Sequence, residues 1–190
     1  MSRPPVLPES TLQLSIPAEG ISSAGLLLRL PTVDDTDAML PAFTDSELRE
    51  AGNLPAFDRE MLHESLRDLP TLMERGRLMP VAAVDTETGE IVGGGMLHHL
   101  DPERSIVEIG YFVFPPARRR GFATRIARML AEHAFSLGLE RVCAYVNVGN
   151  VASDRVLDRA GYTREGVVRS MPKPDGRRVD KTLYSLLPGE

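Results

Sequence analysis

Short apolar runs and helical spacings follow one another along the chain and predict an alternation of strands and helices. Apolar or alternating runs predict strands at residues 26–30, 80–85, 91–98, 106–114, 141–147, 162–169 and 179–187. Apolar residues three and four apart predict helices that begin at residue 34 or 35, cover 58–68, run from 122 to about 137 and cover 151–160. A helical turn is expected from Pro70 to about Arg75, and a loop at 44–57. This order predicts one mixed α/β (α+β) domain whose sheet has helices on both faces.

The N-terminal stretch differs in composition from the rest of the chain. Residues 1–22 are rich in Pro, Ser and Gly, and one short piece, Thr11–Ile16, alternates between apolar and polar positions. This stretch is either a tail or an added edge strand, and the pattern leaves both open. We therefore divide the chain into an N-terminal extension, residues 1–22, and one domain, residues 23–190.

The junction after residue 114 carries the clearest candidate chemistry. An apolar strand stops at Pro115-Pro116, which cannot donate to a sheet ladder, and a long amphipathic helix begins near Phe122. The first turn of a helix leaves N–H groups unpaired and carries roughly half a positive charge from the macrodipole. Gly121 and Ala123 let an anion approach the backbone closely. Three cations stand beside them in the sequence: Arg118, Arg119 and Arg120. This turn is therefore expected to bind the pyrophosphate of a nucleotide-type cofactor.

Composition and charge argue against several classes of function. With 190 residues the chain fits one domain, and its net charge of −5 argues against a general nucleic-acid binder. The single cysteine, Cys143, excludes an internal disulfide and a cysteine-based zinc site, and its place in an apolar run predicts a buried strand residue. No run is long enough to span a membrane and no signal-peptide pattern begins the chain. We therefore expect a soluble, cytoplasmic protein.

The sequence lacks two familiar phosphate-binding motifs at this turn and contains a third pattern. Neither the P-loop pattern G-x-x-x-x-G-K-[ST] nor the Rossmann pattern G-x-G-x-x-G occurs there. What stands there, Arg118-x-x-Gly121-x-Ala123, resembles the [QR]-x-x-G-x-[GA] signature of the GCN5-related N-acetyltransferases, the GNAT superfamily. The resemblance implies that this turn, with Phe122 and Thr124, holds acetyl-CoA by its pyrophosphate.

Further runs resemble the RimJ/RimL-like branch of this superfamily. They are Glu108-Ile-Gly-Tyr111, Gly121-Phe-Ala-Thr124, Ala144-Tyr-Val-x-x-x-Asn150-x-x-Ser153-x-x-Val-Leu157, and Ala160-Gly-Tyr162 with Glu165-Gly166. The resemblance covers roughly residues 24–187. It implies a single-domain GNAT fold with a mixed, mostly antiparallel sheet of about seven strands.

The resemblance also assigns residues to acetyl-CoA. In the family, the strand before the phosphate turn carries a bulge and its backbone pairs with pantetheine. A backbone N–H of that strand would also stabilise the oxyanion formed at the thioester carbonyl. The strand residues implied are Phe112, Val113 and Phe114. Asn147 and Asn150 are implied to lie at the pantetheine arm, although Asn150 fits equally well as a helix N-cap. Ser153 is implied to contact the cofactor and to protonate the leaving thiolate, with a plain first-turn serine as the alternative.

Glu108 is the candidate general base. It lies on a predicted central strand, where a carboxylate must be hydrogen-bonded, solvated in a cleft or shifted in pKa. Glu108 could remove a proton from the amine, directly or through water; the alternative is a carboxylate that anchors a loop or orients a cationic substrate. His98 is expected nearby as a candidate substrate contact. No metal site is expected, because His98 and His99 are adjacent and would face opposite sides of a strand.

Together these features predict an N-acyltransferase that moves an acetyl group from acetyl-CoA to a primary amine by direct attack in a ternary complex. The acceptor stays open between a protein N-terminal α-amine and a small-molecule amine, and a succinyl-type donor is an alternative. A different class also stays open: a catalytically silent acyl-CoA-binding module. No nucleic-acid or membrane partner is expected, and the chain is expected to be a monomer or a homodimer.

Overall fold

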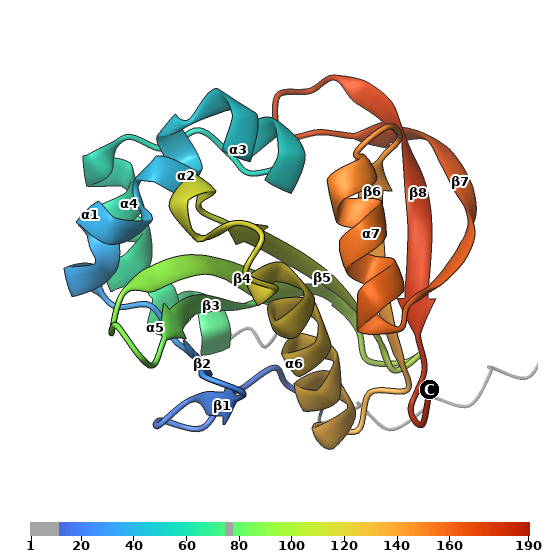
Figure 1. The fold of residues 1–190 in the computed structure, drawn as a ribbon, viewed down its shortest axis with the longest axis horizontal. Helices are drawn as coiled ribbons and strands as arrows, with labels where there is room; N and C mark the ends of the chain where they lie inside the picture. Colours follow the sequence, from blue (N-terminus) through green and yellow to red (C-terminus); the bar gives the residue numbers. More distant parts are fainter. Residues whose placement is uncertain (1–11, 75–77) are drawn as a thin grey trace, which may run out of the picture.

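The computed structural model describes residues 12–74 and 78–190, and at its centre lies one eight-stranded sheet (Figure 1). The strands are β1 (Ile21–Ser23), β2 (Leu26–Arg29), β3 (Leu78–Asp85), β4 (Ile91–Asp101), β5 (Ile106–Val113), β6 (Arg141–Asn147), β7 (Thr163–Pro172) and β8 (Arg178–Leu186). They lie in the order β1-β2-β3-β4-β5-β6-β8-β7. Among the described strands, every neighbouring pair is antiparallel except β5 with β6. The mixed, mostly antiparallel sheet is thus confirmed.

Strand β1 is the one that the sequence pattern did not predict, and it raises the number of strands from about seven to eight. It pairs with β2 at the edge of the sheet. The alternating piece Thr11–Ile16 does not supply this strand; its first residue lies outside the described part of the chain, and the others are in no strand. Even so, Leu14 is 2% exposed in the main core, and the Ser15 carbonyl accepts a hydrogen bond from His133 Nε2 (2.6 Å). Residues 14 to 23 therefore pack on the sheet and helix that follow them.

The helices agree with the expected positions except in one region. Their bounds are η1 (Val33–Asp35), α1 (Thr36–Met39), α2 (Pro41–Thr44), α3 (Ser46–Gly52), α4 (Arg59–Arg67), α5 (Leu69–Glu74), η2 (Pro115–Ala117), α6 (Phe122–Ser136) and α7 (Val151–Ala160). The helix expected from residue 34 or 35 is divided into three short pieces, because Pro41 starts a new turn. The expected end of the turn after Pro70, Arg75, lies outside the described residues.

Helix α3 is the exception, since the prediction of a loop at 44–57 was wrong there. The Asp45 carboxylate accepts a hydrogen bond from the backbone N–H of Leu48 (2.9 Å) and caps the helix. Asn53 ends it in the left-handed conformation, with φ of 54°. The Gly52-Asn53 pair that favoured a loop is therefore a helix C-terminus. At seven residues, α3 is too short for its apolar spacing to be recognised in the sequence.

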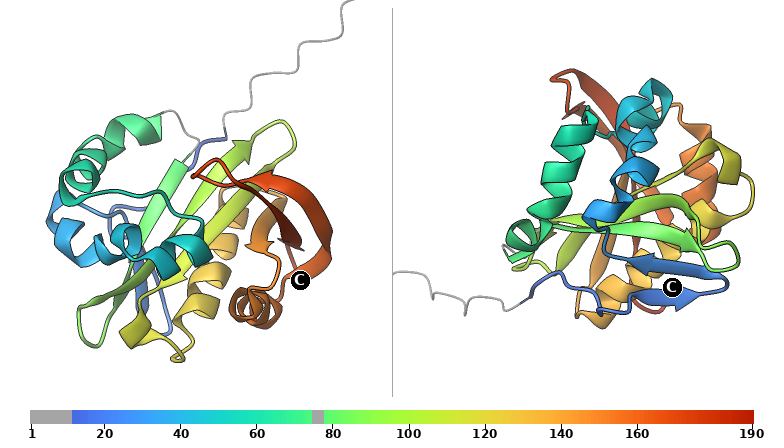
Figure 2. Two further views of the ribbon diagram at one scale, coloured as in Figure 1. Left: turned by 90° about the horizontal axis from the view of Figure 1, so that it is seen from above. Right: turned by 90° about the vertical axis from the view of Figure 1, so that its left-hand side faces the viewer.

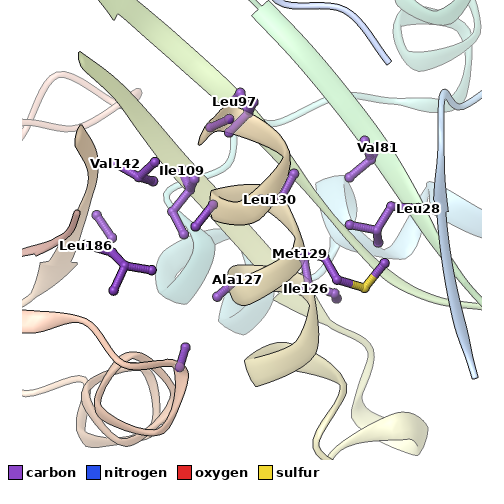
Figure 3. Packing of buried hydrophobic residues seen from close by; sticks show 14 of the residues in the cluster. Leu28, Val81, Leu97, Ile109, Ile126, Ala127, Met129, Leu130, Val142 and Leu186 are labelled. Atoms are coloured by element: carbon purple, nitrogen blue, oxygen red, sulfur yellow. The ribbon is translucent and has the colours of Figure 1, made fainter. Parts of the chain in front are cut away.

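The largest core lies between α6 and one face of the sheet (Figure 3). Ile126 and Leu130, one helical turn apart, are fully buried, and they pack with strand residues such as Leu28, Val81 and Leu97. The three-and-four spacing of the apolar residues in α6 therefore makes a single buried face, as the sequence predicts.

A second core covers the opposite face, where α1 to α4 lie (Figure 2). Phe112 of β5 packs there with Phe114 and with Leu48 of α3. The Phe112 ring needs a glycine at position 94, because a Cβ at Gly94 would come within 2.9 Å of the ring. Ile109 belongs to the first core, so β5 contributes to both. Helices on both faces of the sheet are therefore confirmed.

Candidate active site

Strands β5 and β6 separate partway along their length and leave an opening inside the sheet. Their parallel pairing ends at Glu108 and Cys143. Beyond that point β5 stays paired with β4 as far as Val113, and β6 stays paired with β8 as far as Asn147. The two strand edges that face each other across the opening can therefore accept an extended polar chain between them, as an added strand.

The main chain of Val113 faces this opening. The Phe114 N–H donates to the carbonyl of Val92 on β4 (3.0 Å). Neighbouring residues of a strand direct their main-chain polar groups to opposite sides, so the Val113 N–H points away from β4. The bulge expected beside this residue is absent from the described pairing, because the β4–β5 register runs without a shift from Val113 to Glu108. That expectation was wrong; the register shift lies further along, at residues 98–101 of β4.

The turn before α6 has the geometry of an anion site. Gly121 is the N-cap of α6 in the left-handed conformation, with φ of 80°, and a Cβ there would meet no described atom within 4 Å. The backbone N–H of Arg125 donates to the Gly121 carbonyl (3.2 Å), which is the first hydrogen bond of the helix. The N–H groups of Phe122, Ala123 and Thr124 precede that bond. An anion can therefore approach these three N–H groups along the helix dipole, in front of a residue without a side chain.

The three arginines of this turn point to different places. Arg118 pairs with Glu47 of α3 (3.0 Å), and Arg120 pairs with the buried Asp85 of β3 (2.7 Å). Arg119 is exposed and adopts a left-handed φ of 64°. Two of the guanidinium groups thus brace the turn against the rest of the fold. Arg119 is the one for which the described residues offer no ion pair.

The first turn of α7 lies across the opening from β5. Asn150 Oδ1 accepts a hydrogen bond from the backbone N–H of Ser153 (3.1 Å), which makes Asn150 the N-cap that its position suggested. The hydroxyl of Tyr111 on β5 donates to the Ser153 carbonyl (3.4 Å). Burial raises the pKa of Tyr111, so the phenol keeps its proton and remains a donor. Asn147, at the end of β6, donates to the carbonyl of Glu50 on α3 (3.0 Å) and joins the opening to that helix.

Two histidines lie next to Glu108, so the prediction that His98 and His99 face opposite sides of the strand was wrong. His99 Nδ1 lies 2.9 Å from Glu108 Oε2, and His98 Nε2 lies 3.7 Å from Oε1 of the same carboxylate. The two imidazoles also meet, with their Nδ1 atoms 3.1 Å apart. His99 has φ of 51° at the register shift of β4, so the alternation of side chains is interrupted there. Adjacent histidines therefore reach one carboxylate instead of facing opposite sides of the strand.

A buried lysine adds positive charge beside this carboxylate. Lys181 of β8 is 4% exposed, and burial lowers its pKa while the charge of Glu108 opposes that shift. Burial is also the main cause of the lowered pKa of His98, with the nearby charges as smaller influences. The imidazole of His98 is therefore neutral at pH 7. Around Glu108 the site thus combines one carboxylate, a neutral histidine and a buried lysine whose pKa is lowered by burial.

A cavity of about 560 Å³ lies between α3 and the tip of the β7–β8 hairpin. These two segments stand next to each other at one end of the molecule (Figure 1). Glu50 of α3 joins them, because its carboxylate pairs with the buried Lys173 and with Arg177 (2.8 Å) of the hairpin. Lys181 is close enough to Lys173 and to Glu108 for their charges to interact, so positive charge extends from the cavity lining toward Glu108.

Sequence reasoning missed three residues of this site: Tyr111, Lys173 and Lys181. Lys181 did leave a signal, since it is a cation that directly precedes the largely apolar end of β8. Lys173 lies in a polar turn, where a lysine is ordinary, so nothing in the sequence indicated that it is buried. Tyr111 was part of a recognised run, but its contact with Ser153 joins residues 42 positions apart and follows from no local pattern.

Comparison with known proteins gives one consistent result. The family model for the acetyltransferase (GNAT) domain matches residues 25–163. YoaA of Bacillus subtilis (strain 168), described as an uncharacterized N-acetyltransferase, is 29% identical over 164 residues, which are 85% of this chain and 93% of YoaA. A solved RimL, the ribosomal L7/L12 alpha-N-protein acetyltransferase in complex with coenzyme A, has a TM-score of 0.75 at 20% identity and covers 90% of this chain and 97% of its own. RimJ of Mycobacterium smegmatis, in complex with a CoA-disulfide, has a TM-score of 0.74 at 23% identity, with 90% and 84% covered.

These matches identify the class of protein as the acetyl-CoA-dependent N-acetyltransferases. The chain belongs to the GNAT family, and the solved RimL and RimJ structures share its fold. Acetyl-CoA is its cosubstrate. Within residues 12–74 and 78–190, no helix combines the length and the apolar character needed to cross a bilayer.

Proposed function

We propose that the acceptor is the α-amine of a peptide or protein N-terminus rather than a polycationic small molecule. We assign the acceptor to the cavity between α3 and the β7–β8 hairpin, and the charge of this acceptor cavity carries the choice. Its charged lining consists of three cations and two anions: Arg49, Lys173, Arg177, Glu50 and Asp175. The buried Lys181 lies close to this lining and to Glu108. A polyamine or an aminoglycoside brings several positive charges and would be repelled there, whereas a peptide brings one amine.

Two further points support an α-amine. Such an amine has a pKa of about 8, against about 10.4 for a lysine, so much more of it is neutral and able to attack at pH 7. The structural neighbour RimL is, by its name, an acetyltransferase of a protein α-amine. Both points favour peptide N-termini over side-chain amines.

We assign acetyl-CoA to the opening between β5 and β6 and to the turn before α6. Gly121 leaves space in front of the N–H groups of Phe122, Ala123 and Thr124, which fits a pyrophosphate. Of the strand residues Phe112–Phe114, Val113 directs its main-chain groups to the opening and fits an amide group of pantetheine, whereas Phe112 and Phe114 direct theirs to β4. Asn147 at the end of β6 and Asn150 at the start of α7 lie at the other side of the opening. Acetyl-CoA supplies the thioester that the amine attacks.

Three groups of this chain would act on the reacting atoms. Glu108 takes a proton from the amine as the C–N bond forms. The Val113 N–H donates to the thioester carbonyl and stabilises its developing negative charge. Ser153 gives a proton to the sulfur as the C–S bond breaks, and recovers one from solvent. His98, neutral at pH 7, borders the amine without repelling it.

A panel of amines tests this proposal. The protein is given acetyl-CoA with peptides that differ in their first three residues, with spermidine, and with an aminoglycoside, while release of free thiol is followed. We expect turnover on the peptides, fastest where the second and third residues are acidic. Turnover confined to spermidine and the aminoglycoside would overturn the choice of acceptor.

The Glu108→Gln variant accompanies the panel because it keeps the size of the side chain and removes the base. General-base removal is expected to lower kcat by about 10²- to 10⁴-fold. The dissociation constant of acetyl-CoA should not change. A variant with the same kcat as the wild type would show that Glu108 only orients the acceptor.

A further inference from the structure

Beside the proposed acceptor position, three side chains with metal-binding atoms converge. His98, His99 and Glu108 each offer one nitrogen or oxygen, and these atoms all lie within 4.8 Å of one another. No other group of three histidine, cysteine, aspartate or glutamate side chains among the described residues brings its ligand atoms this close together. The geometry points to a binding site for a divalent transition metal ion of the Zn²⁺ type, formed by His98, His99 and Glu108.

The distances agree with those between ligands of one zinc ion. Zn²⁺ holds imidazole nitrogen at about 2.0–2.1 Å and carboxylate oxygen at about 2.0–2.2 Å in a tetrahedron, which separates neighbouring ligand atoms by roughly 3.3–3.5 Å. The two Nδ1 atoms are 3.1 Å apart, and His99 Nδ1 is 2.9 Å from Glu108 Oε2. His98 approaches Glu108 through its other ring nitrogen, with Nε2 3.7 Å from Oε1, and the three ligand atoms lie within 4.8 Å of one another. His98 therefore has to turn or shift its ring for one nitrogen to share an ion with His99 and Glu108.

The hydrogen bonding of the two imidazoles also favours a cation. When two Nδ1 atoms face each other, a single proton can satisfy the pair, so neutral rings require one particular combination of tautomers. A metal ion between them would accept the lone pairs of both rings at once. The oxygens of Glu108 would supply the negative charge that a divalent ion requires.

The backbone prepares this arrangement. A histidine with φ of 51° is uncommon, because the left-handed conformation brings Cβ too close to the following carbonyl oxygen. This backbone conformation turns the His99 side chain to the same side of the strand as His98. Side-chain exposure of 76% for His99 and about a fifth for the other two leaves the cluster open to solvent. A fourth coordination position would thus be available to water or to an incoming amine.

The charge of Lys181 opposes the ion, because it lies close enough to interact with Glu108. We therefore expect a reversible site rather than a permanent structural one. An ion held there would occupy the carboxylate that we propose as the base. It would stop acetyl transfer while leaving the acetyl-CoA site unchanged, and this consequence rests on the proposed function, whereas the binding itself does not.

Equilibrium binding of Zn²⁺ to the chelator-treated protein, read against a chromophoric zinc indicator, tests the site. We expect one Zn²⁺ per chain in the wild type, and at least about a tenfold weaker affinity in His99→Ala and in Glu108→Gln. The matched control is His63→Ala on α4, which removes a histidine outside the cluster and should bind as the wild type does. Visible absorption of Co²⁺ in the wild type should show a tetrahedral site that His99→Ala lacks. Equal Zn²⁺ affinity in the wild type and His99→Ala would overturn the inference.

Activity separates this inference from the proposed function. Zn²⁺ should abolish thiol release from a good peptide acceptor, a chelator should restore it, and the thermal shift given by acetyl-CoA should persist throughout. If Zn²⁺ binds through His99 while turnover continues, the metal site stands and the base role of Glu108 fails. If the wild type binds no Zn²⁺, the metal site fails and the base role is untouched.

Discussion

At the scale of single residues, Ser153 in the first turn of α7 makes its structural contacts through its main chain, while its proposed chemical role belongs to its hydroxyl. Asn150 caps the helix through the backbone N–H of Ser153, so the Ser153 hydroxyl is not needed for that cap. Tyr111 likewise binds the Ser153 carbonyl and not its side chain. The hydroxyl of Ser153 can therefore be removed without loss of either contact, which makes its proposed role testable.

We expect Ser153→Ala to fold as the wild type does and to lose activity. If the hydroxyl protonates the leaving thiolate, kcat should fall by about 10²-fold or more, because general-acid catalysis contributes roughly 10²–10⁴. Thermal unfolding and steady-state thiol release measure the two effects separately.

Asn150→Ala is the matched control for that substitution. It removes the cap and should lower the unfolding free energy by about 1 kcal/mol. If Ser153→Ala keeps the full activity of the wild type, the Ser153 hydroxyl is not the proton donor and Ser153 is a plain first-turn serine.

The residue scale also shows where a local rule fails. Alternation of side chains places His98 and His99 on opposite faces, and it holds only while each residue keeps strand dihedral angles. At His99 the register shift and the positive φ break that condition. The residue type histidine does not specify a left-handed backbone conformation, so the cluster around Glu108 could not be predicted from the sequence.

At the scale of elements, the junction from β5 to α6 is the part that the sequence predicts best. Prolines end the strand, Gly121 adopts the left-handed φ that it tolerates, and one-sided apolar spacing sets the buried face of α6. Each of these effects acts over a few residues. The partners of Arg118 and Arg120 were not predicted, because Glu47 and Asp85 lie on distant elements.

We expect Gly121→Glu to abolish the stabilisation by acetyl-CoA. A ligand that binds the native state at 100 times its dissociation constant stabilises it by about 2.7 kcal/mol, and a carboxylate in front of the helix N-terminus should remove this shift. Thermal unfolding with and without acetyl-CoA measures it.

Gly138→Glu is the control, because Gly138 follows the other end of α6 with φ of 90° and an equally open surrounding. Both variants should lose roughly 1–2 kcal/mol of intrinsic stability from the left-handed backbone. The acetyl-CoA shift should survive in Gly138→Glu alone. Its survival in Gly121→Glu would remove the pyrophosphate from this turn.

At the scale of the whole molecule, an ion pair fixes the turn from β2 into η1, where the chain leaves the sheet for the helical layer. The Asp35 carboxylate accepts two hydrogen bonds from Arg29 of β2 (2.7 and 2.8 Å) and one from the Thr32 N–H (2.7 Å). The hydrogen bonds from Arg29 are the largest cause of the lowered pKa of Asp35; burial opposes them. Because the folded pKa lies below the unfolded value of about 3.9, this stabilisation is present at neutral pH and is lost as the pH falls through the folded pKa.

Asp35→Asn should therefore lower the unfolding free energy by about 1.5–3 kcal/mol at pH 7, the range for hydrogen bonds to charged groups. The difference from the wild type should shrink as the pH is lowered below 4, in urea unfolding at several pH values. The neighbouring Asp34→Asn, at an exposed position, should leave the midpoint nearly unchanged. A difference that stays constant down to low pH would show that Asp35 acts through packing and not through its charge.

The sequence by itself determined the order of the elements apart from β1 and α3, the family resemblance, and the glycine turn before α6. These depend on the periodicity of apolar residues and on the dihedral preferences of Pro and Gly, which act locally. Tertiary structure alone decided where β5 and β6 separate, which groups surround Glu108, and that α3 meets the β7–β8 hairpin. Asn147 and Arg177 reach Glu50 across 97 and 127 positions of the chain, for example. The charge of the cavity between α3 and the β7–β8 hairpin depends on such distant contacts, because they decide which cations are buried and which stay in water.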